Sequence, residues 1–498
     1  MQILQIMNYA NKIKIYSQHL HKFADSHYFY MEINLELLSV QNPWWQGISL
    51  EFDPVVEAYR EQPLKLETMF SADFDLKKDR IYFLAAGRGI GKTTIFKNLI
   101  KELIAKKKID PENIFYYSCH NIDTYEQLNE LIKIFLNWRG KTRARKFIFI
   151  DEITLIKNWQ KGINFLDRAR KFRGITLFLA GSNLPGKSLP VKAVTKIIAS
   201  IDFLEFIRLI SPEFTKRIGK DLKTAGQRKN NFLKFSKQLD YYLDIYFLTG
   251  GFFTGLNSYN SRGGLEQKIY SDHLYWLISD LAKIGRDVSL LRQIMEQVLL
   301  KIGQPLGHKT IARRTKAKTH LTVGEYLNIL ENNFSLKQVY QSDKQGRISK
   351  SKAKKVYFRD PFLFWLHYSY IHGALSYWQF SRERLHREEI FSALVENVVF
   401  SHLIKDETII DWGKRVTYWR DNARKKEINF LVKSGRKVTP ILIRYNKKVV
   451  DQDKNILEQA GFKEGIIISK DEYSVNKNIK VIPLVYFLLF YKSYLGEK

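Results

Sequence analysis

A glycine-rich segment early in the chain has the residue types and spacing needed to hold a row of phosphates. The candidate binding loop consists of Ala86, Gly87, Arg88, Gly89, Ile90, Gly91, Lys92, Thr93 and Thr94. Its glycines let the backbone turn several N–H groups toward one anion. Lys92 is placed to reach the β- and γ-phosphates, and the Thr93 hydroxyl is placed to bind Mg²⁺. Ala86 replaces the first glycine of the usual GxxxxGK[ST] (Walker A) pattern, which adds a methyl group and removes no phosphate donor.

A second candidate group lies about sixty residues further on, where an apolar run ends in two acids, Asp151 and Glu152 (KFIFIDE). This is the Walker B pattern. A buried parallel strand delivers Asp151 to its carboxyl edge as a second metal ligand, and Glu152 can activate a water molecule in line with the γ-phosphate. The alternative is an ordinary strand that ends in two solvated acids. With the glycine loop nearby, we predict Mg-ATP binding, with Glu152 and Lys92 as catalytic residues.

Polar residues also follow a third apolar run, at Ser182 and Asn183. In ATPases of this pattern, the strand between the loop strand and the Walker B strand ends in a polar residue that senses the γ-phosphate. The same Gly-Ser-Asn sequence also opens turns, so both interpretations remain open. The chain contains no Asn-Lys-x-Asp motif for guanine, which favours ATP over GTP.

Alternating strand and helix patterns must position these groups. The runs Ile81–Ala86, Asn113–Cys119, Lys146–Asp151 and Ile175–Ala180 have the apolar character of buried strands, and a helical pattern follows the glycine loop. Such alternation predicts an α/β fold with a parallel sheet covered by helices on both faces. A helix that begins at the loop also directs the positive end of its dipole at the phosphates.

The composition narrows the classes of partner. The chain has 498 residues, and its 81 Lys and Arg against 51 Asp and Glu give a formal charge of +30. This excess is typical of nucleic-acid binding, although a Lys-rich source proteome or an anionic membrane surface would also account for it. The single cysteine, Cys119, excludes internal disulfides, and we find no secretory signal, so we predict a cytoplasmic protein. Val481–Tyr491 is too short to cross a bilayer and is predicted to be a buried strand and helix.

A strongly basic module follows between residues 288 and 358. Its pattern of three helices and two strands predicts a winged helix, in which one helix enters the major groove of DNA and the wing contacts phosphates. The candidate DNA-binding residues are Arg313, Arg314, Lys316, Lys318, Arg347, Lys350, Lys352, Lys354 and Lys355. The alternative is a packing module with a solvated charged face.

The chain resembles the AAA-type ATPases of archaea and bacteria known as archaeal ATPases. The resemblance covers nearly the whole chain and is carried by NPWW at 42–45, AGRGIGKTT at 86–94, FIDEIT at 149–154 with Trp159, AGSN at 180–183, LTGGF at 248–252, YFRDPFL at 357–363 and LVEN at 394–397. It implies a P-loop domain followed by a winged helix and a C-terminal domain similar to PD-(D/E)xK nucleases.

Two departures from that family qualify what the resemblance implies. Members carry a Gly-Arg pair shortly after the sensor strand, whereas this chain has only Lys187 and Lys192 there, and lysine lacks the planar fork of arginine. In the nuclease-like part, Asn429 stands where the metal-binding Asp belongs, and Leu442 and Arg444 replace the Glu and Lys that follow. We therefore expect no nuclease activity, and we expect Glu396 and Glu427 to be packing or surface residues.

The sequence is expected to divide into an N-terminal extension, a P-loop domain, a helical lid, a winged helix and a nuclease-like α/β domain. The predicted ranges are 1–75, 76–210, 211–285, 286–385 and 386–498. The leading hypothesis is an ATP-dependent switch or motor that acts on DNA. The alternative is a STAND-like signalling ATPase that uses ATP as a latch to recruit a protein. A protein partner or self-association remains open, and no membrane partner is expected.

Overall fold

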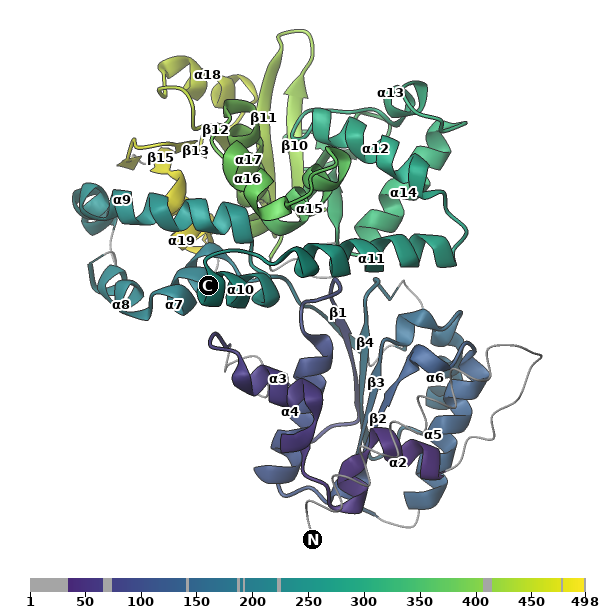
Figure 1. Ribbon diagram of the computed structural model, residues 1–498. Helices are drawn as coiled ribbons and strands as arrows, with labels where there is room; N and C mark the ends of the chain where they lie inside the picture. The colour runs from purple at the N-terminus through teal and green to yellow at the C-terminus, as the bar shows by residue number, and fades with distance from the viewer. Residues whose placement is uncertain are drawn as a thin grey trace.

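The structure is a computed structural model of the chain. It describes residues 35–65, 74–139, 143–185, 189–190, 193–221, 225–405, 414–475 and 478–496. Figure 1 shows two stacked parts, a lower one built on a sheet with helices on each side and an upper one that is largely helical and contains the C-terminal sheet. Of the expected N-terminal extension, the described residues begin at Leu35.

A five-stranded parallel sheet in the order β2-β3-β4-β1-β5 forms the centre of the lower part. Its strands are β1 (Arg80–Ala85), β2 (Ile114–Ser118), β3 (Lys146–Asp151), β4 (Ile175–Gly181) and β5 (Ala193–Ile197). Every pairing in this sheet is parallel. The central strands are uninterrupted apolar runs because helices bury both of their faces. The predicted α/β fold is therefore confirmed.

Helices cover both faces of this sheet. The helices are α2 (Leu35–Gln41), α3 (Pro54–Glu61), α4 (Lys92–Ala105), α5 (Tyr125–Arg139) and α6 (Trp159–Arg168). Apolar residues of α4 pack on one face, whereas those of α2, α5 and α6 pack on the other. Figure 1 shows α3 and α4 on one side of the strands and α5 and α6 on the other. The glycine loop therefore lies between a buried strand and a helix that is held on the sheet.

The NPWW sequence fastens the N-terminal segment to the sheet edge. The Asn42 side chain accepts a hydrogen bond from the backbone N–H of Tyr116 (2.7 Å) and donates one to its carbonyl (2.9 Å). The indoles of Trp44 and Trp45 both donate to the Ile114 carbonyl, at 3.1 and 2.8 Å. Because β2 is the edge strand, these bonds occupy backbone groups that an open edge would expose. This motif is structural.

A helical region follows the parallel sheet. Its helices are α7 (Phe203–Ile210), α8 (Pro212–Asp221), α9 (Ala225–Thr249), α10 (Phe253–Arg262) and α11 (Gln267–Lys283). The next unit consists of α12 (Val288–Leu300), α13 (His308–Arg313), α14 (His320–Asn332) and the antiparallel pair β6 (Leu336–Val339) and β9 (Lys355–Phe358). This order of three helices and two strands matches the predicted pattern, and the assignment as a winged helix stays a prediction.

The connection between those two strands, which we predicted to be a wing, contains strands of its own. It contains β7 (Gln341–Ser342) and β8 (Ile348–Ser349), which form the edge of a second sheet of eight strands. There, β7 pairs in parallel with β10 through Gln341 and Tyr418. The predicted wing is therefore part of the C-terminal sheet, because the partner strand lies about eighty residues further along the chain.

The C-terminal part surrounds this mixed sheet, whose order is β14-β15-β13-β12-β11-β10-β7-β8. Its remaining strands are β10 (Val416–Asp421), β11 (Lys426–Ser434), β12 (Lys437–Arg444), β13 (Gly465–Ser469), β14 (Ser474–Val475) and β15 (Ile479–Pro483). Its helices are α15 (Pro361–Ile371), α16 (Tyr377–Arg384), α17 (Glu388–Leu403), α18 (Asp451–Gln459) and α19 (Leu484–Leu495). The predicted buried strand and helix at Val481–Tyr491 are confirmed as β15 and α19. None of the described helices is long and apolar enough to span a bilayer.

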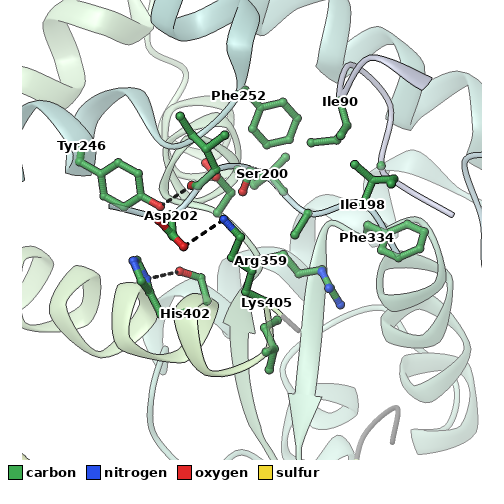
Figure 2. A pocket seen from close by; sticks show the side chains of 17 residues that line it. Ile90, Ile198, Ser200, Asp202, Tyr246, Phe252, Phe334, Arg359, His402 and Lys405 are labelled. Atoms are coloured by element: carbon green, nitrogen blue, oxygen red, sulfur yellow. Dashed lines mark hydrogen bonds and ion pairs between the residues drawn. The ribbon is translucent and has the colours of Figure 1, made fainter. Parts of the chain in front are cut away.

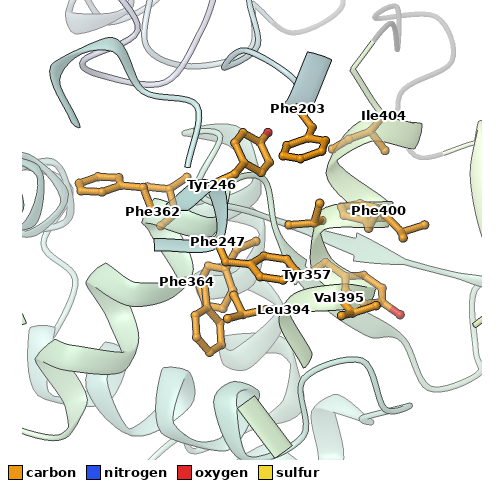
Figure 3. Packing of buried hydrophobic residues seen from close by; sticks show 14 of the residues in the cluster. Phe203, Tyr246, Phe247, Tyr357, Phe362, Phe364, Leu394, Val395, Phe400 and Ile404 are labelled. Carbon is orange, nitrogen blue, oxygen red and sulfur yellow. The ribbon is translucent and has the colours of Figure 1, made fainter. Parts of the chain in front are cut away.

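One hydrophobic cluster links the helical region to the C-terminal part. Besides Leu64, it contains residues from Ile201 to Leu495, among them Tyr246 of α9, Phe362 of α15 and Phe400 of α17. Figure 3 shows the side chains of these three elements packed together. The cluster crosses the boundaries that we placed at residues 285 and 385, and those boundaries stay predictions.

Candidate nucleotide site

The glycine loop connects the end of β1 to the start of α4, as predicted. The Ala86 N–H continues the sheet by donating to the Gly181 carbonyl at 3.3 Å. Gly89 and Gly91 have positive φ angles of 78° and 102°, a backbone conformation that other residues adopt only with strain. Gly91 is the N-cap residue of α4, and Thr93 and Thr94 lie half-buried in its first turn. The backbone of the loop is therefore shaped as an anion cradle.

Lys92 points into this cradle. Its side chain is 4% exposed, and its ammonium group donates to the carbonyls of Ala86 and Gly87, both at 3.2 Å. It also donates to the Ser182 hydroxyl at 2.9 Å and lies 3.6 Å from a Glu152 carboxylate oxygen. The ammonium group thus occupies the mouth of the loop, where an incoming phosphate would replace the two carbonyls as its partners.

Asp151 and Thr93 meet at the carboxyl edge of the sheet. The Thr93 hydroxyl donates to Asp151 at 2.6 Å, and the Tyr116 hydroxyl donates to the same carboxylate oxygen at 3.2 Å. Asp151 is 1% exposed, and burial together with the charge of Glu152 raises its pKa despite the bond from Thr93. A buried carboxylate beside a hydroxyl suits Mg²⁺, which takes one or two protein oxygens and completes its shell with water and phosphate.

Glu152 follows directly and is held in a left-handed conformation with φ of 50°. Its carboxylate accepts hydrogen bonds from the Ser182 hydroxyl at 2.8 and 3.0 Å. Burial alone would raise its pKa, but the charges of Lys92 and Arg88 and the bond from Ser182 outweigh burial, and its pKa is lowered. Glu152 is therefore ionised at neutral pH and able to accept a proton.

Ser182 lies next to the loop lysine and the acidic pair, and its role as a γ-phosphate sensor stays a prediction. Strand β4 lies between β1 and β3, and Ser182 follows its end. The backbone N–H of Ser182 donates to the Thr154 hydroxyl at 3.1 Å, which fixes its side chain between Lys92 and Glu152. Asn183 lies half-buried beside it. The two lysines that we considered as substitutes for the family arginine, Lys187 and Lys192, lie outside the described residues.

Elements from later in the chain cover the loop. Arg88 forms a two-pronged ion pair with Asp280 of α11, at 2.8 and 3.0 Å. A Cβ atom added to Gly89 would lie 2.5 Å from the His273 imidazole of the same helix, and one added to Gly87 would lie 3.5 Å from Phe334. No local sequence pattern indicates these contacts, because their partners in α11 and at Phe334 come much later in the chain.

A cavity opens beside the loop (Figure 2). Its apolar lining includes Ile90, Ile198 and Phe252, and Figure 2 shows them facing the same space from three segments. On the far wall, Lys405 forms an ion pair with Asp202 at 3.1 Å. The cavity thus joins the phosphate loop to the helical region and to the C-terminal part.

The predicted DNA-binding residues do not share one environment. Arg313, Arg314, Lys316 and Lys318 are exposed around the end of α13, and Arg347, Lys350 and Lys352 are exposed on the β7–β8 segment. Lys354 is half-buried. Lys355 is 0% exposed and forms ion pairs with Glu427 at 2.6 Å and Glu396 at 3.0 Å, so its assignment to a DNA surface is wrong.

The same contacts define the two carboxylates of the nuclease-like part. Glu396 on α17 and Glu427 on β11 converge on the Lys355 ammonium group, as packing residues. Asn429 accepts a hydrogen bond from the Ile443 N–H at 2.9 Å, and Arg444 is paired with Asp453 at 2.5 Å. The described residues therefore show an internal cation, Lys355, between the carboxylates.

A parallel sheet in this order, with a phosphate loop after β1 and an acidic pair after β3, defines a P-loop NTPase. Within that class, residues 78–198 match a family model described as an AAA domain. Residues 241–367 and 391–487 match two models described as domains of unknown function, DUF8612 and DUF4143. A comparison with curated proteins finds no match.

Several solved structures are similar over parts of the chain. The ORC1 protein of Aeropyrum pernix in complex with DNA is 13% identical, with 56% of this chain and 83% of that chain covered and a TM-score of 0.27. AMPPCP-bound DnaA from Aquifex aeolicus is 15% identical, with 62% and 92% covered and a TM-score of 0.22. A signal transduction ATPase with a tetratricopeptide repeat sensor from Pyrococcus horikoshii is 12% identical, with 67% and 44% covered and a TM-score of 0.24. At these scores the likenesses carry no argument about function.

Proposed function

We propose that this chain binds Mg-ATP at the glycine loop, hydrolyses it, and uses the cycle to act on DNA. The observation that carries the ATPase proposal is the convergence of Lys92, Ser182 and Glu152, from three separate elements, on one point beside the loop. Such a group combines the cation, the polar sensor and the base that phosphoryl transfer to water requires.

The chemistry assigned to each residue follows from its contacts. Lys92 exchanges its bonds to the loop carbonyls for bonds to the β- and γ-phosphates, and Ser182 contacts the γ-phosphate. Glu152 orients a water molecule for in-line attack and accepts its proton, which its lowered pKa permits at neutral pH. Thr93 and Asp151 would hold Mg²⁺, which would supply positive charge near the phosphate oxygens.

The DNA part of the proposal is supported by charge. The chain carries a formal charge of +30, and exposed cations gather around α13 at Arg313, Arg314, Lys316 and Lys318. A polyanion is the partner that such a surface attracts most strongly. The loop contacts α11 through the Arg88–Asp280 pair, and α11 leads directly into α12. A change in the loop on ATP binding would therefore reach that module through α11.

A second function, a signalling latch, is favoured by the same loop contacts. The Arg88–Asp280 ion pair and the close approach of His273 to Gly89 couple loop geometry to the helical region without requiring turnover. In that case ATP would hold one conformation and a protein partner would recognise it.

Steady-state hydrolysis with and without DNA separates the two functions. The leading proposal predicts that duplex or single-stranded DNA raises the rate of phosphate release, and that Glu152→Gln removes both the basal and the stimulated rate. Slow hydrolysis that is indifferent to DNA would contradict it and favour the latch.

A further inference from the structure

A cleft lies between the helical unit and the C-terminal sheet, away from the nucleotide site. One wall is the turn that follows α12 and the start of α13, and the other wall is formed by β10 and β11. Its volume is about 380 Å³, and its polar and charged lining residues are Lys301, Gln304, Thr310, Arg314, Arg420 and Glu427. Figure 1 shows α12 and α13 beside β10 at this junction.

Both walls of the cleft carry cations. Lys301 and Arg314 come from the helical wall, and Arg420 comes from β10. Lys301 and Arg314 are exposed, and in the part of the chain that the structure describes neither forms an ion pair with an acid. Their charge is therefore available to a ligand.

The one acid in the lining, Glu427, is already neutralised. One of its oxygens lies 2.6 Å from the Lys355 ammonium group, and the other lies 3.1 Å from Arg420. Burial would lower the pKa of Lys355, but the charges of Glu396 and Glu427 outweigh burial and raise it, so Lys355 stays charged. Lys355, which Glu427 shares with Glu396, and Arg420 together offset the negative charge of Glu427 that would otherwise repel an anion at the cleft.

The turn that forms the first wall is held in place by contacts with Lys354 and Glu396. The backbone of Leu306 exchanges two hydrogen bonds with Lys354, at 2.8 and 3.2 Å. Gly303 passes so close to Glu396 that an added Cβ atom would lie 3.1 Å from its carboxylate. The walls therefore keep their spacing, and the cleft is a preformed site.

We propose that this cleft binds the sugar-phosphate backbone of DNA, an inference that rests on the proposed action on DNA and gives it a location. Cations on both walls, with the neutral polar side chains of Gln304 and Thr310 between them, suit the charged and hydrogen-bonding oxygens of a phosphodiester. The lining contains no aromatic side chain on which a base could stack, so the contacts expected in the cleft are those to the backbone.

The test is equilibrium binding of the full chain to a fluorescent 20-base-pair duplex and to its single strand, followed by anisotropy over a series of salt concentrations. The cleft variant is Lys301→Gln with Arg314→Gln. The control, Lys106→Gln with Lys107→Gln, removes the same charge from exposed residues at the end of α4, far from the cleft. The difference in affinity between the duplex and the single strand shows which form of DNA the cleft binds.

We expect the cleft variant to bind at least about tenfold more weakly, with the slope of log affinity against log salt reduced by about two, and the control to change less than about twofold. An equal loss in both variants, or none in the cleft variant, would overturn the cleft while leaving DNA binding intact. Displacement of DNA by polyglutamate at matched charge concentration would also overturn it, in favour of an acidic peptide. Absence of DNA binding by the unmodified chain would overturn the proposed action on DNA as well.

Discussion

The Ser182 hydroxyl lies at the centre of the candidate site. It accepts a hydrogen bond from Lys92 and donates to Glu152, so it links the cation of the loop to the proposed base. Each of the three side chains is fixed by a different element, and none of them is free to turn away without leaving a buried polar group unpaired. This arrangement makes the base position sensitive to what Lys92 binds.

Glu152→Gln tests the role of the base. The amide keeps the size and accepts the Ser182 hydrogen bond, but it cannot take a proton from water. We expect ATP affinity to stay within about threefold of the unmodified chain and the hydrolysis rate to fall by roughly 10²- to 10⁴-fold. Single-turnover phosphate release with bound labelled ATP measures both. The matched change Glu130→Gln, at an exposed position of α5, should leave the rate unchanged; a Glu152→Gln variant that still turns over normally would remove Glu152 from the mechanism.

At this scale the sequence predicted the residues that share a local pattern. Asp151 ends β3 and Glu152 follows it, whereas Lys92 and Thr93 follow β1 after the glycine loop. Their meeting at one sheet edge follows from the parallel pairing of these strands. Lys355 was assigned wrongly to the surface, because it stands in a basic run while its two counter-ions come from α17 and β11. No local pattern records that burial.

Among the helices and strands, Asp360 connects the start of α15, the turn between α9 and α10, and the segment that follows β5. Its carboxylate caps the start of α15 through the Phe362 N–H at 2.8 Å and accepts the Gly251 N–H at 2.9 Å, close to the segment that leaves β5. Burial raises its pKa to about 6, although hydrogen bonds from Ser200, Gly251 and Phe362 oppose the shift. The LTGGF and YFRDPFL sequences therefore meet at one buried carboxyl.

This raised pKa predicts a pH dependence of stability. The folded pKa lies above the unfolded value near 3.8, so the favourable contribution of protonated Asp360 is complete below that value and is lost as the pH rises through 6. Asp360→Asn keeps a capping side chain that does not titrate. Relative to the unmodified chain, the variant should gain on the order of 1–2 kcal/mol in unfolding free energy between pH 5 and pH 7.5. Urea unfolding at both pH values measures this, and a difference that does not change with pH would show that Asp360 is not the titrating group.

Gly251 makes a second prediction for the same junction. A Cβ atom at this position would lie 2.2 Å from the Ile201 carbonyl oxygen, and backbone cannot move aside as a flexible side chain can. We expect Gly251→Ala to lower the unfolding free energy by roughly 2 kcal/mol or more. Gly307→Ala, where the nearest atom would be 3.7 Å away, should cost less than about 0.5 kcal/mol. Equal thermal stability of the two variants would mean that the junction is looser than its contacts indicate.

The sequence predicted elements better than their partners. Strands β1 to β4 were recognisable as apolar runs, and their parallel pairing followed from the helices between them. The β7–β8 segment carries a short basic pattern that indicates a turn between strands, but its hydrogen-bonding partner is β10. The apolar pattern of a strand indicates which of its faces are buried. It does not indicate which sheet the strand joins, because that depends on segments far away in the sequence.

In the molecule as a whole, the part built on the parallel sheet and the upper part meet at the glycine loop. Helix α11 contacts the loop through Asp280 and His273, and α14 ends beside it at Phe334. A change in loop geometry on ATP binding would therefore shift α11, which leads into the helices α12 and α13 that border the cleft. The sequence could not predict this meeting, because it depends on how the chain returns after the helical region.

All of these proposals depend on the glycine loop binding ATP through Lys92. The most direct measurement is a calorimetric titration of the purified chain with ATP in the presence of Mg²⁺, repeated for Lys92→Ala and for Lys106→Ala, an exposed lysine just beyond the same helix. We predict saturable binding by the unmodified chain and by Lys106→Ala, and at least about tenfold weaker binding by Lys92→Ala, because bonds from an ammonium group to phosphate are lost. Binding that is absent from the unmodified chain, or unchanged in a folded Lys92→Ala variant, would contradict the assignment of this loop as the nucleotide site.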